Sequence, residues 1–194
     1  MTSDPLSLLV RAVGQAGDVI AGVKPDQADQ PTPCRSWTVR QLVEHVIHDM
    51  EQFAKTAGGG RADWSSPAAG VEENWVHAYR SRADALTAAW GAAELTGTTE
   101  LPGLGEVPAR TPVDMQVAEL AVHAWDLATA TGQSIDLDPE VAEAGLEFMR
   151  QMLAPKFRGS EEDGKAFGPE VDPGPDASPY ERLVAFAGRD PVRR

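Results

Sequence analysis

The sequence predicts an all-α protein, built as a four-helix bundle with an extra fifth helix and a short C-terminal helix. Long stretches place apolar residues three and four positions apart, which is the spacing of one face of an α-helix. Residues typical of helix starts, such as Asp-Pro, Thr-x-x-Gln and Ser-x-x-Glu, precede several of these stretches. The chain of 194 residues is long enough for a sizeable core. We therefore expect residues 1–194 to form a single helical-bundle domain.

The first two predicted helices carry the clearest end signals. The first runs from about Pro5 to Val23, with Asp4 as its cap and proline at its first position. The second begins after Thr38, which can form a capping box with Gln41, and it ends at the three glycines of residues 58–60. Both helices carry one continuous apolar stripe, so both are expected to pack against a common core.

The later elements follow from similar signals. A third helix is predicted over Val71 to Trp90, a fifth begins at Asp138, and a short last helix opens with a capping box at Ser178. Residues 95–107 alternate loosely around a Pro-Gly turn, which is compatible with a small hairpin between the third and fourth helices. Residues 155–177 are rich in proline and glycine, and we expect them to form a surface segment with little regular structure.

The fourth predicted helix has polar residues on an otherwise apolar cylinder. Thr111 is a candidate N-cap, and Gly132 is placed to end the helix. The polar residues share one stripe: Gln116, Glu119, His123 and Asp126. Periodicity alone favours a solvent-exposed face for this stripe. The alternative is a metal site, because Glu119 and His123 are four residues apart and so lie one turn apart on the same face.

A metal site needs a third ligand from another helix of the bundle. His45 lies at the edge of the apolar stripe of the second helix, so its side chain can turn toward the bundle interior. His48 falls on the opposite, polar face, and His77 lies off the apolar face of the third helix. His45, Glu119 and His123 are therefore the candidate ligands.

Composition excludes several classes of function. The net charge is −13, from 17 basic and 30 acidic residues, which disfavours binding to nucleic acid or to anionic lipid. No stretch approaches the roughly 20 apolar residues of a membrane span, and the first residues lack the basic region of a signal peptide. A single cysteine rules out an internal disulfide and suits a reducing cytoplasm.

Two motifs resemble the DinB/YfiT-like metal-binding helical bundles. The first is Thr32-Pro33-Cys34-x-x-Trp37-Thr38-Val39-Arg40-x-Leu42-x-x-His45. The second is Glu119-Leu120-x-x-His123-x-Trp125-Asp126-Leu127-Ala128-x-Ala130-Thr131-Gly132. They are most similar to the actinobacterial branch related to the N-terminal domain of mycothiol-dependent maleylpyruvate isomerase. The ending around Leu183 and Gly188-Arg189-Asp190-Pro191 also resembles that branch.

The resemblance implies an antiparallel four-helix core and one divalent metal, most often zinc, with nickel, manganese or iron as alternatives. Residue by residue, the ligands carry over to His45, Glu119 and His123. The resemblance also implies mycothiol as a co-substrate and a small electrophilic molecule as the substrate. The isomerase has a second, C-terminal domain that this chain is expected to lack, so the resemblance does not by itself imply maleylpyruvate isomerisation.

Three ligands leave one position of a zinc site open, as in catalytic zinc sites. A thiol bound there would be deprotonated and could attack an electrophilic carbon. The predicted function is therefore a metal- and thiol-dependent transferase or isomerase. The alternatives are a metal-dependent protein that binds or senses a small molecule without catalysis, and a bundle whose metal site has lost its function.

Other side chains have narrower candidate roles. Asp126 can orient a ligand histidine by hydrogen bonding. Asp49, one turn after His45, is a candidate fourth ligand or orienting residue. Cys34 precedes a helix, which favours its thiolate, but it has no histidine or second cysteine near it in sequence. The third helix offers Arg80 and Arg82 as cations to anchor a substrate. The surplus of apolar residues is compatible with a homodimer.

Overall fold

Helices make up almost all of the regular structure, which confirms the predicted all-α class. The computed structural model describes residues 4–35, 37–64, 74–134, 136–160, 165 and 167–191. The described residues form six α-helices, two short 3-10 turns and one two-stranded sheet. No helix among them is long and apolar enough to cross a membrane.

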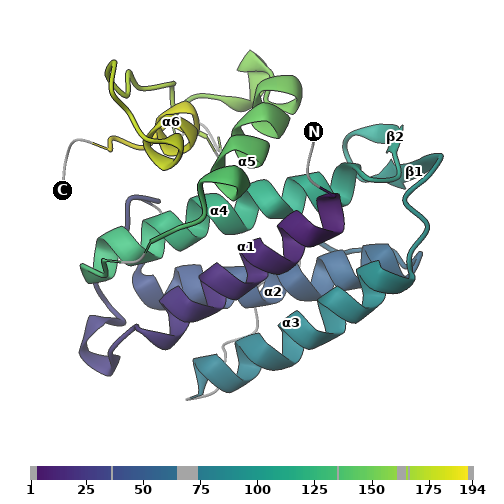
Figure 1. Cartoon of the computed structure of the whole chain (residues 1–194), viewed down its shortest axis with the longest axis horizontal. Coiled ribbons are helices and arrows are strands. Elements are labelled where there is room, and N and C mark those ends of the chain that lie inside the picture. Colours follow the sequence, from purple (N-terminus) through teal and green to yellow (C-terminus); the bar gives the residue numbers. More distant parts are fainter. Residues whose placement is uncertain are drawn as a thin grey trace.

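Four helices pack in a ring around the main core. They are α1 (Pro5–Ala21), α2 (Val39–Ala57), α3 (Trp75–Ala92) and α4 (Thr111–Thr131). Each helix contacts two neighbours in the order α1, α3, α2, α4 and back to α1. Figure 1 shows α1 in front of α2, with α4 above it and α3 along the lower edge. The fully buried side chains between them include Leu9, Ile20, Leu42, Met50, Leu86 and Leu127.

Two further helices lie on the opposite side of α4. These are α5 (Pro139–Met152) and α6 (Pro179–Phe186), and both contact α4 and each other. Figure 1 shows them above α4 and away from α2 and α3. The glycine at position 145 permits this contact, because a Cβ there would stand 3.2 Å from the Cα of Ala118. As a result, α4 has packed neighbours on both sides.

The helix starts follow the signals in the sequence, with one correction. The side chain of Asp4 accepts a hydrogen bond from the Ser7 amide, and Thr38 and Gln41 form the predicted capping box. Thr111, however, is the first helical residue of α4 and not its cap. The cap is Arg110, which makes no side-chain capping bond and instead pairs with Asp114 one turn ahead.

The third helix starts later than predicted, and the predicted hairpin is present with slightly different bounds. Helix α3 begins at Trp75, with Asn74 as its cap, and the predicted start at residues 71–73 lies outside the described residues. The hairpin between α3 and α4 is present as β1 (Thr98–Leu101) and β2 (Gly105–Pro108). The two strands are antiparallel, with Thr99 opposite Val107, and Gly103 and Gly105 take positive φ in the turn.

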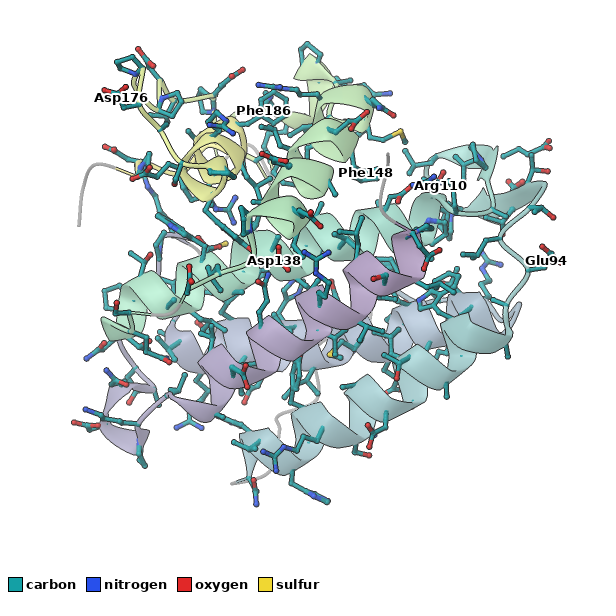
Figure 2. All side chains as sticks on the ribbon, viewed as in Figure 1. Glu94, Arg110, Asp138, Phe148, Asp176 and Phe186 are labelled. Atoms are coloured by element: carbon teal, nitrogen blue, oxygen red, sulfur yellow. The ribbon has the colours of Figure 1, made fainter. Side chains whose placement is uncertain are left out.

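Polar contacts tie α1 to the start of α5. Arg11 of α1 pairs with both Asp138 and Glu140, and Figure 2 labels Asp138 close to α1. One turn later, Gln15 accepts a hydrogen bond from the amide of Asp138 and donates one to the hydroxyl of Tyr180 on α6. These contacts fix the angle at which α5 leaves the loop after α4, and hence the position of its apolar face over α4.

Candidate metal centre

The three predicted ligands come together where α2 faces the middle of α4. Each offers one ligand atom, and these atoms all lie within 4.8 Å of one another. The Glu119 Oε2 atom is 3.3 Å from His123 Nε2 and 3.7 Å from His45 Nε2. We refer to His45, Glu119 and His123 as the His–Glu–His cluster.

The spacing within the cluster fits a single metal ion. Two atoms bound about 2.1 Å from one tetrahedral zinc ion are about 3.4 Å apart, close to both separations measured here. Two imidazole nitrogens and one carboxylate oxygen are also a donor set found in catalytic zinc sites. The cluster could therefore hold a divalent metal without large movement of its side chains.

The polar stripe of α4 is not a solvent-exposed face, contrary to what periodicity alone indicates. Gln116 is 1% exposed, His123 is 7% exposed and Asp126 is fully buried. Gln116 lies against α2 and accepts a hydrogen bond from Trp90 of α3, and Asp126 pairs with Arg189 of the segment after α6. The periodicity of α4 alone shows neither contact. Only Glu119 keeps substantial exposure, with about a third of its side chain open.

Asp126 orients His123 and is itself held by an arginine from the end of the described chain. Its Oδ2 atom is 3.1 Å from His123 Nδ1 and 2.9 Å from the Arg189 guanidinium. The Arg189 Nε also donates to Oδ1 at 3.3 Å. Because an ionised carboxylate only accepts hydrogen bonds, Nδ1 of His123 carries the proton, and Nε2 is left as the ligand atom.

Arg189 reaches Asp126 because the chain turns sharply after α6. Gly188 takes a φ of +86° there, and its Cα packs directly against Gly168. In the sequence, Arg189 belongs to a motif that resembles the family's ending, and no role was predicted for it. A signal was present: if Asp126 is buried on α4, its charge requires a cation, and buried charges are almost always paired.

Electrostatics favour charged forms within the cluster. Burial alone would lower the pKa of His123, but hydrogen bonds to Asp126 and Glu119 raise it to about 9. Burial would raise the pKa of Glu119, but contacts with His123 and His45 hold it below its usual range. For Asp126, the charge of Arg189 and the bond from His123 outweigh burial and lower the pKa. The metal-free cluster is thus a carboxylate beside a protonated histidine. A metal cation that binds there would displace the proton from His123.

Asp49 lies beside the cluster rather than within it. Its Oδ2 is 3.4 Å from His45 Nε2, the same nitrogen that faces Glu119, so Asp49 stays a candidate fourth ligand, although the three converging ligand atoms do not include it. Burial and the negative charge of Glu119 raise the pKa of Asp49 to about 7. His48 and His77 lie outside the cluster, as predicted from the helix faces.

Aromatic packing holds the His45 ring in place. The ring of Trp37, just before α2, lies 4.2 Å from the His45 ring between centroids. The His45 and His123 rings meet edge to face at 5.2 Å. Trp37 therefore packs as expected for an aromatic residue, and in doing so it limits the rotation of His45.

The cluster forms one end of a cavity of about 690 Å³. Cys34, Asp49 and Arg189 also line this end. Arg80 and Arg82, the predicted anchoring cations, do not line it, and Arg82 pairs instead with Glu51. Three residues of α5, Phe148, Met149 and Met152, form part of the cavity wall.

Comparison with known proteins identifies relatives and a shared fold. Two uncharacterized proteins, from two strains of Mycobacterium tuberculosis, are each 38% identical to the chain over 187 residues. The match covers 96% of this chain and 98% of theirs. A crystal structure of a mutant of mycothiol-dependent maleylpyruvate isomerase aligns with a TM-score of 0.56 at 17% identity, which shows a shared fold. That alignment covers 72% of this chain and 65% of the isomerase, so the chain spans less than two thirds of that protein.

The family match is more specific than the fold alone. Residues 9–128 match the family described as the mycothiol maleylpyruvate isomerase N-terminal domain. This range is more than half of the chain, and it contains all three residues of the His–Glu–His cluster. The chain therefore belongs to the mycothiol maleylpyruvate isomerase N-terminal domain family.

Proposed function

We propose that this protein is a divalent-metal-dependent enzyme that transfers a low-molecular-weight thiol to an electrophilic molecule, or isomerises that molecule through the thiol. One observation carries the proposal: three ligand atoms of the types preferred by zinc converge at the end of a cavity large enough for a reactant. Zinc is the preferred ion, because two histidines and one carboxylate form a common catalytic zinc set. The family supports mycothiol as the thiol.

The protein residues hold and shape the site. His45 and His123 would bind the ion through Nε2 and Glu119 through its carboxylate. Asp126 keeps the proton of His123 on Nδ1, and Trp37 limits the rotation of His45. Such an ion, when bound, lowers the pKa of a coordinated thiol so that it is a thiolate near neutral pH.

At the electrophilic carbon, the transfer step forms one bond and breaks one. The thiol sulfur bonds to the electrophilic carbon, the leaving group departs with its electron pair, and the thiol proton passes to solvent. In the isomerisation variant, the thiol adds to a double bond, a single bond rotates, and the thiol leaves unchanged. Both reactions need a reducing compartment to keep the thiol free, which is consistent with the cytoplasm as the expected location.

The first test is metal content. We expect the purified protein, supplied with zinc at neutral pH, to hold close to one equivalent by mass spectrometry, and a His45→Ala/His123→Ala variant to hold little. His48→Ala is the matched control, because it removes a histidine from the same helix but outside the cluster, and it should keep its metal. Absence of metal from the native protein, or equal metal in both variants, would overturn the ligand assignment.

The second test separates catalysis from binding. Mycothiol and 1-chloro-2,4-dinitrobenzene should give the S-conjugate and chloride faster with the zinc-loaded protein than with the double variant. Metal binding without any thiol-dependent turnover, across haloarenes and activated alkenes, would instead favour the non-catalytic binding or sensing protein.

A further inference from the structure

The cavity wall away from the His–Glu–His cluster is almost entirely apolar. Helices α4 and α5 contribute most of this wall, together with Phe53 of α2, Trp64, the hairpin turn and the segment after α5. The apolar residues lining this part are Phe53, Trp64, Leu101, Pro102, Leu104, Met115, Ala118, Val122, Phe148, Met149, Met152, Leu153, Phe157 and Phe167. Methionine and aromatic side chains adapt to ligands of varied shape.

Two cations, Arg189 and Lys165, line the cavity among the residues that the structure describes, and they differ in their partners. All three nitrogen atoms of Arg189 donate internally, to Asp126 and to the carbonyl of Ala187, and the Asp126 carboxylate offsets its charge. The ammonium of Lys165 donates to the carbonyl of Lys156, a neutral acceptor that does not offset its charge. The lining therefore offers one cation to a ligand, whereas nearly all of the wall away from the cluster offers only apolar contacts.

The volume suits a substantial apolar molecule. Pockets that enclose drug-sized ligands span about 300–1,000 Å³, and this cavity of about 690 Å³ lies within that range. A small charged molecule would leave most of the apolar wall in contact with water. An apolar molecule would bury it, at a gain of about 0.8 kcal/mol for each methylene removed from water.

We propose that the electrophile is a largely apolar molecule whose reactive carbon lies at the His–Glu–His cluster and whose body lies along the apolar wall to which α4 and α5 contribute. The reaction in this statement rests on the function proposed above, whereas the binding of the apolar body does not. The polar end receives the thiol and the reactive carbon, and the apolar end selects the substrate by its size and apolar character.

Binding is tested with N-phenyl-1-naphthylamine, an uncharged dye that fluoresces in apolar surroundings. We expect saturable binding to the full-length protein, with or without zinc. Met115→Glu on α4 and Met152→Glu on α5 each place a charge in the cavity lining and should each weaken binding at least tenfold, while Met152→Leu should not. Val10→Glu is the matched control, because Val10 is 55% exposed on α1, outside the cavity lining, and its substitution should leave binding unchanged.

Competition then tests the chemical class. Straight-chain alcohols should displace the dye with affinity rising about fourfold per methylene, the factor that corresponds to 0.8 kcal/mol, and maleate should not displace it. Absence of saturable dye binding, equal binding by the glutamate variants and Val10→Glu, or displacement by maleate but not by alcohols would overturn the proposal. If the native protein binds the dye but neither holds zinc nor shows thiol-dependent turnover, the proposed function is overturned and the apolar binding site is not.

Discussion

Asp126 carries its charge inside the protein, where it serves two partners at once. It accepts from Nδ1 of His123 on the same helix and from Arg189 after α6. Removal of one member of a buried ion pair leaves the other charge without compensation, which is far more costly than the loss of an exposed pair. Asp126 therefore connects the packing of the chain to the orientation of a candidate ligand.

We predict that Asp126→Asn lowers the free energy of unfolding by about 3 kcal/mol, measured by urea denaturation, because the Arg189 charge stays buried. The same variant should bind zinc 10–100-fold more weakly in a chelator competition assay, since His123 loses the acceptor that fixes its tautomer.

The matched control for this prediction lies on the same helix. Asp114 pairs with Arg110 at the exposed start of α4, so Asp114→Asn should cost at most about 1 kcal/mol and leave zinc affinity unchanged. Similar losses in the two variants would show that the buried pair has no special role.

At the scale of elements, the end of α6 determines where Arg189 lies. Gly188 adopts a left-handed φ of +86°, and a Cβ on it would stand 2.7 Å from the Cα of Gly168. Both backbone segments are fixed by hydrogen bonds, including one from the Arg158 guanidinium to the Gly168 carbonyl. An alanine at 188 therefore requires movement of the main chain that precedes Arg189.

We predict that Gly188→Ala lowers the free energy of unfolding by more than about 2 kcal/mol, through backbone strain and the clash together. Because the change shifts Arg189 away from Asp126, zinc affinity should fall as well. Gly174→Ala provides the comparison: its φ of +83° imposes the same strain, but nothing lies within 4 Å of the added Cβ. It should cost about 1 kcal/mol and leave zinc affinity intact, and equal effects of the two substitutions would contradict the prediction.

At the scale of the whole molecule, the cluster makes global stability depend on pH. Despite burial, hydrogen bonds raise the pKa of His123 from 6.5 to about 9 in the metal-free protein. Between these values the folded state retains a proton that the unfolded state has lost. The contribution is therefore complete below pH 6.5 and is lost as pH rises through 9.

We predict that the metal-free protein becomes less stable between pH 6.5 and pH 9, by an amount on the order of 3 kcal/mol. Thermal or urea unfolding across this window measures the change. His123→Gln should flatten the profile, and saturating zinc should reverse the trend, because metal binding requires His123 to lose that proton. A flat profile in the native metal-free protein would disprove the raised pKa.

The sequence was sufficient to predict the helices and the hairpin, because caps and periodicity are local signals. The meeting of His45, Glu119 and His123 joins two helices, and the family resemblance was needed to predict it. Caps and periodicity were not sufficient to predict the burial of Gln116 against α2 and α3, or that of Asp126 beside Arg189, because both depend on contacts with other parts of the chain. The cavity wall was missed for the same reason, since several elements contribute to it. The homodimer stays a prediction.

The location of Phe148, Met152 and Phe167 has a consequence for how this family diversifies. These residues line the cavity but lie beyond residue 128, where the family match ends, whereas the His–Glu–His cluster lies within the matched region. Under the proposed function, substitutions in the later region would change which molecule the cavity accepts without changing the His–Glu–His cluster. Related proteins would then differ in the molecule they bind while they keep the same cluster, provided that an arginine still reaches Asp126.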